Sequence, residues 1–231
     1  MYVVEGRTPG IEASRAALEG IYRLVEDTAT PAVWVWQPER QVAFGPRDVA
    51  HGGYSAAVEA ARDRGYEPVE RTVGGHPVAH TGSTLAFARA VPIEDPRRGL
   101  STRYDAALAA VDAALADLGV AVERGEPAES FCPGQHSLSA NGKVVGLAQR
   151  VTGSFAVVSG VAVVSDPAAV ADVLLPVYKA LSLPFDPTTV GSIADAGGPA
   201  EPAAVAEAIE SALIGDHRAE SITLERLRGH P

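Results

Sequence analysis

The chain has 231 residues, of which 46% are hydrophobic, and a formal net charge of −10. This length and apolar content can fill the core of one large domain. The arginines are scattered among acidic residues, which argues against nucleic acid as a partner, because such a surface needs a basic stripe. No apolar run is long enough for a membrane span and no basic flank precedes an apolar stretch at the N-terminus, so we expect a soluble cytoplasmic protein with no membrane partner.

The first elements are a helix and a short strand. Apolar residues between Ala13 and Val25 recur at helical spacing and predict an amphipathic helix that ends near Pro31. Residues 33–36, VWVW, predict a buried strand, and residues 41–45, QVAFG, look like its hairpin partner. We expect the two tryptophans of this strand to belong to the core.

A second helix is predicted near residues 54–64, and a strand follows at 68–73. This strand leads into RTVGGHPVAHTGSTLAFARAVP, residues 71–92, which ends in a predicted core strand. Its glycine pair, Gly74 and Gly75, allows either a plain hairpin turn or a close approach of the main chain to a ligand.

Two histidines of this segment, His76 and His80, are four residues apart in an extended context. The spacing places both side chains on the same face of a strand but offers no third ligand. With one cysteine in the chain, neither a disulfide nor a structural zinc site is expected, and we predict no metal.

The clearest predicted helix covers residues 99–120, with Ser101 or Thr102 as its N-terminal cap. The segment SFCPGQHSLSANGKVVGLAQRV, residues 130–151, then predicts a hairpin, because Asn141-Gly142 favours a two-residue turn with positive φ. Further strand residues surround Gly160, and short helices alternate with turns beyond them. Strands that follow one another without strict helix alternation predict an α/β (α+β) domain with antiparallel hairpins.

This hairpin carries Cys132 before one arm and Lys143 at the start of the other. A cysteine can form a thioester once it is ionised, and a nearby lysine can favour the thiolate and hold a developing oxyanion. Taken alone, the cysteine can equally be buried packing and the lysine a solvated turn residue.

Taken together, the two segments resemble the biotin/lipoate protein ligase superfamily. ERTVGGHPVAHTGSTLAFA is similar to the family's glycine-rich segment, and GKVVGLAQ to the signature that holds its lysine. The Cys-Pro-Gly at 132–134 is similar to that of the cysteine-dependent octanoyl-[GcvH]:protein amidotransferases. The resemblance implies a mixed, largely antiparallel sheet flanked by helices, in a single catalytic domain over residues 1–231 with its core at about 10–195.

The resemblance also implies roles for individual residues. Cys132 would accept an octanoyl or lipoyl chain as a thioester, and Lys143 would contact the acyl carbonyl or the phosphate of an acyl-adenylate. The residues that would bind the acyl group or nucleotide are Arg71, Gly74, Gly75, His76, His80 and Gly146. Those that would line an apolar slot for the acyl chain are Val73, Val78 and Val145.

The implied partners are lipoyl-domain proteins, namely the glycine cleavage H protein and the E2 subunits of 2-oxoacid dehydrogenases, with acyl carrier protein as a further donor. An ATP-dependent ligase, which would need ATP and magnesium, is the first alternative. Glu70 and His76 depart from the ligase pattern. They leave less positive charge and less room for a nucleotide phosphate. A non-catalytic relative that only binds acyl groups or lipoylated protein is the second alternative.

Overall fold

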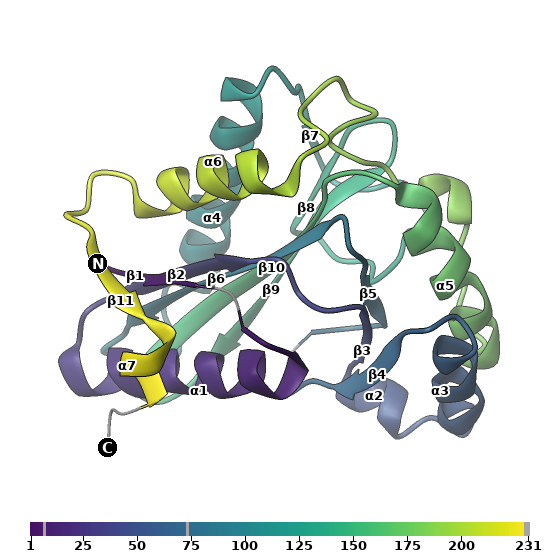
Figure 1. Cartoon of the computed structure of the whole chain (residues 1–231), viewed down its shortest axis with the longest axis horizontal. Helices are drawn as coiled ribbons and strands as arrows, with labels where there is room; N and C mark the ends of the chain where they lie inside the picture. The colour runs from purple at the N-terminus through teal and green to yellow at the C-terminus, as the bar shows by residue number, and fades with distance from the viewer. Residues whose placement is uncertain (7, 73, 229–231) are drawn as a thin grey trace.

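The computed structural model describes residues 1–6, 8–72 and 74–228. Eight strands in this part of the chain form one sheet in the order β11-β1-β2-β6-β10-β9-β8-β7 (Figure 1). These strands are β1 (Tyr2–Glu5), β2 (Ala32–Trp36), β6 (Thr84–Pro92), β7 (Glu123–Arg124), β8 (Ser137–Ser139), β9 (Lys143–Val151), β10 (Phe155–Val163) and β11 (Glu220–Thr223).

Most neighbours in this sheet are antiparallel. From β2 through β6, β10, β9 and β8 to β7 every pairing is antiparallel, whereas β1 runs parallel to both β2 and β11. The predicted fold class, a mixed and largely antiparallel sheet flanked by helices, is confirmed.

Helices cover both faces of the large sheet (Figure 1). On one face lie α4 (Leu100–Asp117) and α6 (Pro202–Ile214), and on the other α1 (Ile11–Thr28) and α7 (Leu224–Arg228). Successive side chains of a strand point to opposite faces of the sheet, so each strand contributes to the hydrophobic core on both sides. In β2, Val33 packs with residues of α4 and α6, whereas Trp34 packs with those of α1.

A small sheet in the order β4-β3-β5 stands beside the large one (Figure 1). It consists of β3 (Gln41–Phe44), β4 (Glu67–Glu70) and β5 (Val78–His80), and it packs with α3 (Tyr54–Arg62) and α5 (Pro167–Ala180). The remaining short elements are α2 (Pro46–Val49) and the 3-10 helix η1 (Pro187–Thr189).

The predicted hairpin between β2 and β3 is wrong. β2 already has β1 on one edge and β6 on the other, so it offers no free edge to β3. β3 pairs instead with β4 and β5. The hairpin was expected because β2 and β3 are adjacent along the chain. In the structure, the more distant strand β6 pairs with the edge of β2 that β3 would need.

Two local details also differ from the sequence predictions. The helix α4 begins after Gly99, at a φ of 73°, and no side chain caps it, so the predicted cap at Ser101 or Thr102 is wrong. Of the two tryptophans, Trp34 is fully buried as expected, but Trp36 is only partly buried. Among the described residues, no helix is long and apolar enough to cross a membrane.

Candidate active site

The turn between β8 and β9 has the positive φ angles that its sequence predicts, but it holds three residues between the paired Ser139 and Lys143 rather than two. Asn141 and Gly142 have φ angles of 53° and 137°, and the Ala140 amide donates to the Gly142 carbonyl at 2.8 Å. A Cβ at Gly142 would lie 2.6 Å from the Gly191 nitrogen, so this position requires glycine. The hairpin is confirmed, and it starts β9 at Lys143.

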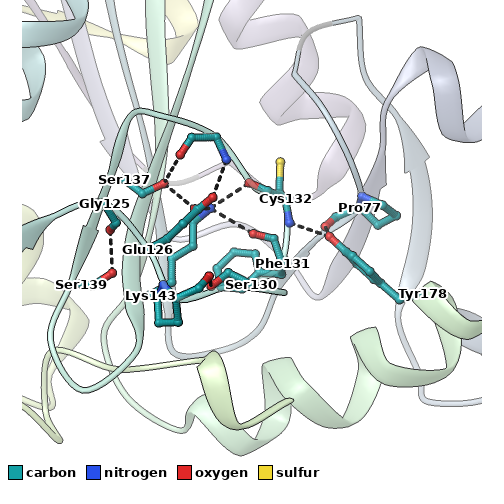
Figure 2. Close-up of polar contacts among 12 residues, drawn as sticks. Pro77, Gly125, Glu126, Ser130, Phe131, Cys132, Ser137, Ser139, Lys143 and Tyr178 are labelled. Atoms are coloured by element: carbon teal, nitrogen blue, oxygen red, sulfur yellow. Dashed lines mark hydrogen bonds and ion pairs between the residues drawn. The ribbon is translucent and has the colours of Figure 1, made fainter. Parts of the chain in front are cut away.

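Lys143 is a buried residue with 1% exposure, so the solvated-turn interpretation is wrong. Its ammonium group donates to the Glu126 carboxylate at 2.5 Å and to the carbonyl oxygens of Phe131 and Cys132 at 3.0 and 2.7 Å (Figure 2). An ammonium group has three N–H donors, and all three are in use.

Glu126 is a site residue that the sequence prediction missed. Besides Lys143, its carboxylate accepts hydrogen bonds from the Gly134 amide at 2.6 Å and the Ser137 hydroxyl at 2.8 Å. One carboxylate therefore ties the loop after Cys132 to the strand that carries Lys143 (Figure 2). In the sequence it is one acid in an acidic loop, and nothing in the local pattern distinguishes it.

Cys132 has a φ of 42°, in the left-handed region that few residues other than glycine adopt. Contacts on both sides hold its peptide in this conformation. Its amide donates to the Tyr178 hydroxyl at 2.6 Å, and its carbonyl oxygen accepts from Lys143. The hydroxyl of Tyr178 in turn donates to the Pro77 carbonyl at 2.9 Å, which links the cysteine loop to the segment before β5.

Tyr178 is suited to this bridging role because it stays protonated. Burial raises its pKa well above 10, so the phenol keeps the proton that it donates to Pro77. A backbone conformation with positive φ at a reactive side chain persists only when the surroundings enforce it. Here the enforcing groups come from α5 and β9.

Arg71 follows β4 and reaches the cysteine from the other side. Its Nη2 donates to the carbonyl oxygens of His76 at 2.6 Å and Gly75 at 3.3 Å, and lies 3.6 Å from the Cys132 sulfur. Gly74 has a φ of 92°, and a Cβ there would come within 2.2 Å of Arg71 Nη1. Gly74 therefore makes room for this guanidinium as well as for the turn.

A cavity of about 640 Å³ opens between the two sheets and α1. The structure brings eight of the predicted site residues to its wall: Arg71, Gly74, Gly75, Val78, His80, Cys132, Lys143 and Gly146. Apolar side chains form much of the rest, including Leu18, Trp36, Ala86 and Val161.

Other predicted residues do not reach this cavity. His76 points to Asp48, with Nδ1 3.4 Å from Oδ1, and is absent from the cavity wall. Val145 is fully buried in the core beneath α4 and α6 rather than in the slot. Val73 lies outside the described residues. In the ranges 1–6, 8–72 and 74–228, no three His, Cys, Asp or Glu side chains are grouped to hold a metal.

His80 lies on the cavity wall as a neutral imidazole. Burial, and secondarily the charge of Arg71, lower its pKa from 6.5 to about 4. Below pH 6.5 the unfolded chain binds a proton at this position that the folded chain does not, so the free energy of unfolding falls as the pH drops to 4. We expect a loss of about 3 kcal/mol over this range.

Urea denaturation at pH 7, 5.5 and 4.5 measures this loss. In His80→Gln, which cannot titrate, the free energy of unfolding should fall less steeply between pH 6.5 and 4. Equal slopes for the wild type and this variant would contradict the neutral imidazole.

Comparison with known proteins assigns the chain to a family. Residues 15–214 match the model of the lipoyl protein ligase A/B catalytic domain. An octanoyl-[GcvH]:protein N-octanoyltransferase of Geobacillus kaustophilus is 34% identical over 127 residues, 54% of this chain and 45% of that protein. The Kyrpidia tusciae protein of the same name is 31% identical over 156 residues, 67% of this chain and 54% of that protein. The matched stretches thus span about half the length of these relatives.

Solved structures agree with this assignment at the level of the fold. Protein Ta0514 of T. acidophilum, solved with bound lipoic acid, has a TM-score of 0.76 and 21% identity, over 98% of this chain and 91% of that one. A lipoate-protein ligase A bound with ATP also has a TM-score of 0.76, at 20% identity and over the same shares. By its sequence over residues 15–214, this chain belongs to the lipoyl protein ligase A/B catalytic domain family.

Proposed function

We propose that this chain transfers an octanoyl or lipoyl group between lysines of lipoyl-domain proteins through a thioester on Cys132. One observation carries the proposal. The chain's single cysteine is on the cavity wall, and its peptide is held at positive φ by Tyr178 on one side and Lys143 on the other. A module that only binds acyl groups needs no such constraint on a thiol.

The names of the relatives support the same class of reaction. They include N-octanoyltransferases that use the protein GcvH and, in Listeria monocytogenes, a lipoyl-[GcvH]:protein N-lipoyltransferase that is 27% identical over 118 residues. We propose that GcvH, the glycine cleavage H protein, is the donor and that an E2 lipoyl domain is the acceptor. Acyl carrier protein is a further candidate donor.

The proposed transfer has two steps, each balanced without ATP. The Cys132 sulfur attacks the amide carbonyl of the acylated donor lysine, the S–C bond forms and the C–N bond breaks. The thiol proton ends on the departing lysine amine. The acceptor amine then attacks the thioester, a new C–N bond forms, and the sulfur leaves with the proton that the amine gives up.

The cavity suits the acyl group of this reaction. Its apolar wall can cover a straight chain, and burial of the seven carbons beyond an octanoyl carbonyl contributes about 6 kcal/mol at about 0.8 kcal/mol per carbon. The thiol lies on the same wall, so a chain inserted between the sheets would present its carbonyl near the sulfur.

The contacts of Lys143 and the position of Glu70 favour transfer over ATP-dependent ligation. Lys143 is already paired with the Glu126 carboxylate and two carbonyl oxygens. Glu70 adds a carboxylate to the cavity wall and accepts a hydrogen bond from the Tyr54 hydroxyl at 3.1 Å. The lysine is therefore without a free donor for a triphosphate, and Glu70 would repel one, although Arg15, Arg71 and Arg150 also line the cavity.

The test compares two reaction mixtures that contain the wild-type protein and an apo E2 lipoyl domain. The first adds octanoylated H protein without ATP, and the second adds free octanoate with ATP and magnesium. We expect the acceptor to gain one octanoyl group, seen by intact mass spectrometry, in the first mixture only. Acylation in the second mixture alone would favour the ligase, and acylation in neither would contradict both enzymes.

A further inference from the structure

The proposed thioester chemistry needs a donor for the negative charge that develops on the sulfur and on the carbonyl oxygen. The backbone at Cys132 and the two residues after it cannot supply one. The amide of Cys132 donates to Tyr178, the amide of Gly134 donates to Glu126, and Pro133 has no N–H. The three donors of Lys143 are also occupied, so neither this lysine nor the backbone of residues 132–134 offers a free donor for the charge.

The guanidinium of Arg71 is the cation in contact with the sulfur. Its Nη2 lies 3.6 Å from Sγ, whereas the contacts of Lys143 are with the carbonyl oxygens of Phe131 and Cys132 and with Glu126. Figure 2 shows the same division, because the carbonyl of Cys132 faces Lys143 while its sulfur points in another direction.

Arg71 also has donors to spare. Its Nε is buried and has no hydrogen-bond partner among the described residues, although Nη2 is held by the carbonyls of Gly75 and His76. A buried N–H without an acceptor is rare in folded proteins and unfavourable. Because this atom is out of contact with solvent, a substrate oxygen would accept from it only once the side chain shifts toward the cavity.

We propose that Arg71 is a catalytic residue of the acyl transfer, which stabilises the Cys132 thiolate and the oxyanion formed on the acyl carbonyl, and that Lys143 and Glu126 position the cysteine peptide. This inference rests on the function proposed above. The guanidinium stays protonated throughout and neither gives nor takes a proton. It contributes charge and N–H donors at the point where the S–C bond forms.

Several other ionisable groups face Cys132, and the test must separate them from Arg71. Lys143 approaches from β9 with its charge balanced by Glu126, and Tyr178 approaches from α5. Beyond them, Asp48 of α2 pairs with His76. Only Arg71 combines a net positive charge with a direct contact to the sulfur in the part of the chain that the structure describes.

The test measures the rate at which iodoacetamide alkylates Cys132 in the 231-residue chain without any acyl substrate. Only the thiolate reacts, so the rate reports how well the protein stabilises the anion. We expect Arg71→Gln to slow alkylation about tenfold at pH 7. Arg71→Lys keeps the positive charge but loses the planar guanidinium, so its alkylation rate should lie between those of the wild type and Arg71→Gln. At pH 10, where a thiol ionises without assistance, the rates should converge.

The matched control is Arg40→Gln, which removes the same charge from an arginine that contacts the ring of Tyr66. Its alkylation rate should equal that of the wild type. If Arg71→Gln alkylates as fast as the wild type at pH 7, or if its deficit persists at pH 10, the inference is overturned. A persistent deficit would mean that access to the thiol, rather than charge, had changed.

Acyl transfer provides the second readout. Arg71→Gln should lower kcat on the order of 10²- to 10³-fold, the usual effect of removing one oxyanion donor. A variant with slow alkylation but normal kcat would overturn the catalytic role. A wild-type protein that transfers no acyl group, yet shows the alkylation difference, would refute the proposed function and leave the contact between Arg71 and the thiolate standing.

Discussion

Replacement of Cys132 by alanine is expected to remove the acyl-protein adduct and to lower the rate of acyl transfer by about a thousandfold or more. The reason is that no other thiol exists in the chain to form the thioester. The measurement is incubation with octanoylated H protein, followed by intact mass spectrometry for the adduct and by a transfer assay with an apo lipoyl domain.

The controls for this variant use the unusual backbone at position 132. Alanine keeps the same strain at a φ of 42°, so the thermal stability should stay close to that of the wild type. Cys132→Gly, which accepts positive φ freely, should be inactive as well but at least as stable. An adduct that persists on the alanine variant would exclude the thioester.

Replacement of Lys143 by methionine is expected to lower the free energy of unfolding by about 3–5 kcal/mol. The exposed fraction of the lysine side chain is 1% and that of Glu126 is 13%, so the change leaves a mostly buried carboxylate without its cation. It also removes the donor to two carbonyl oxygens of the cysteine loop. Urea denaturation followed by circular dichroism measures the loss.

Two further variants show whether this loss comes from the ion pair. Lys179→Met changes the chain's other lysine, which is exposed on α5, and should alter stability by no more than about 0.5 kcal/mol. Adding Glu126→Gln to Lys143→Met should recover part of the loss, because the unpaired charge is gone. A cost below about 1 kcal/mol for Lys143→Met would mean that the pair does not hold the loop.

The two predictions distinguish a residue that reacts with the acyl group from a residue that holds the cysteine loop in place. Cys132 variants should lose transfer with little change in stability, whereas Lys143 variants should lose both, since the same ammonium group holds the cysteine carbonyl and the Glu126 carboxylate. The sequence-based interpretation gave Lys143 contact with the acyl carbonyl. That contact requires one of its three present partners to be exchanged for substrate.

Local features of the sequence determined several elements correctly. The turn at Asn141-Gly142 followed from the preference of this dipeptide for positive φ, and the helix α4 from its apolar period. The core strand β6 followed from a run of apolar residues. In each case the interactions that decide the conformation lie within a few residues along the chain, so a short segment contains the necessary information.

The partners of these elements were decided only by the tertiary structure. β3 joined β4 and β5 because β6, far along the chain, occupied the edge of β2. Lys143 became buried because Glu126, 17 residues away, came within 2.5 Å of it.

The same holds for the geometry around the thiol. The motifs identified Cys132 and Arg71 as site residues, but their contact across 61 residues of sequence arises from packing of the two loops against each other. Tyr178, which supplies the hydroxyl that holds the cysteine amide, had no sequence signal and reaches the site from α5. Residue types and local turns are encoded over short distances, whereas burial, charge pairing and catalytic geometry depend on which distant segments pack together.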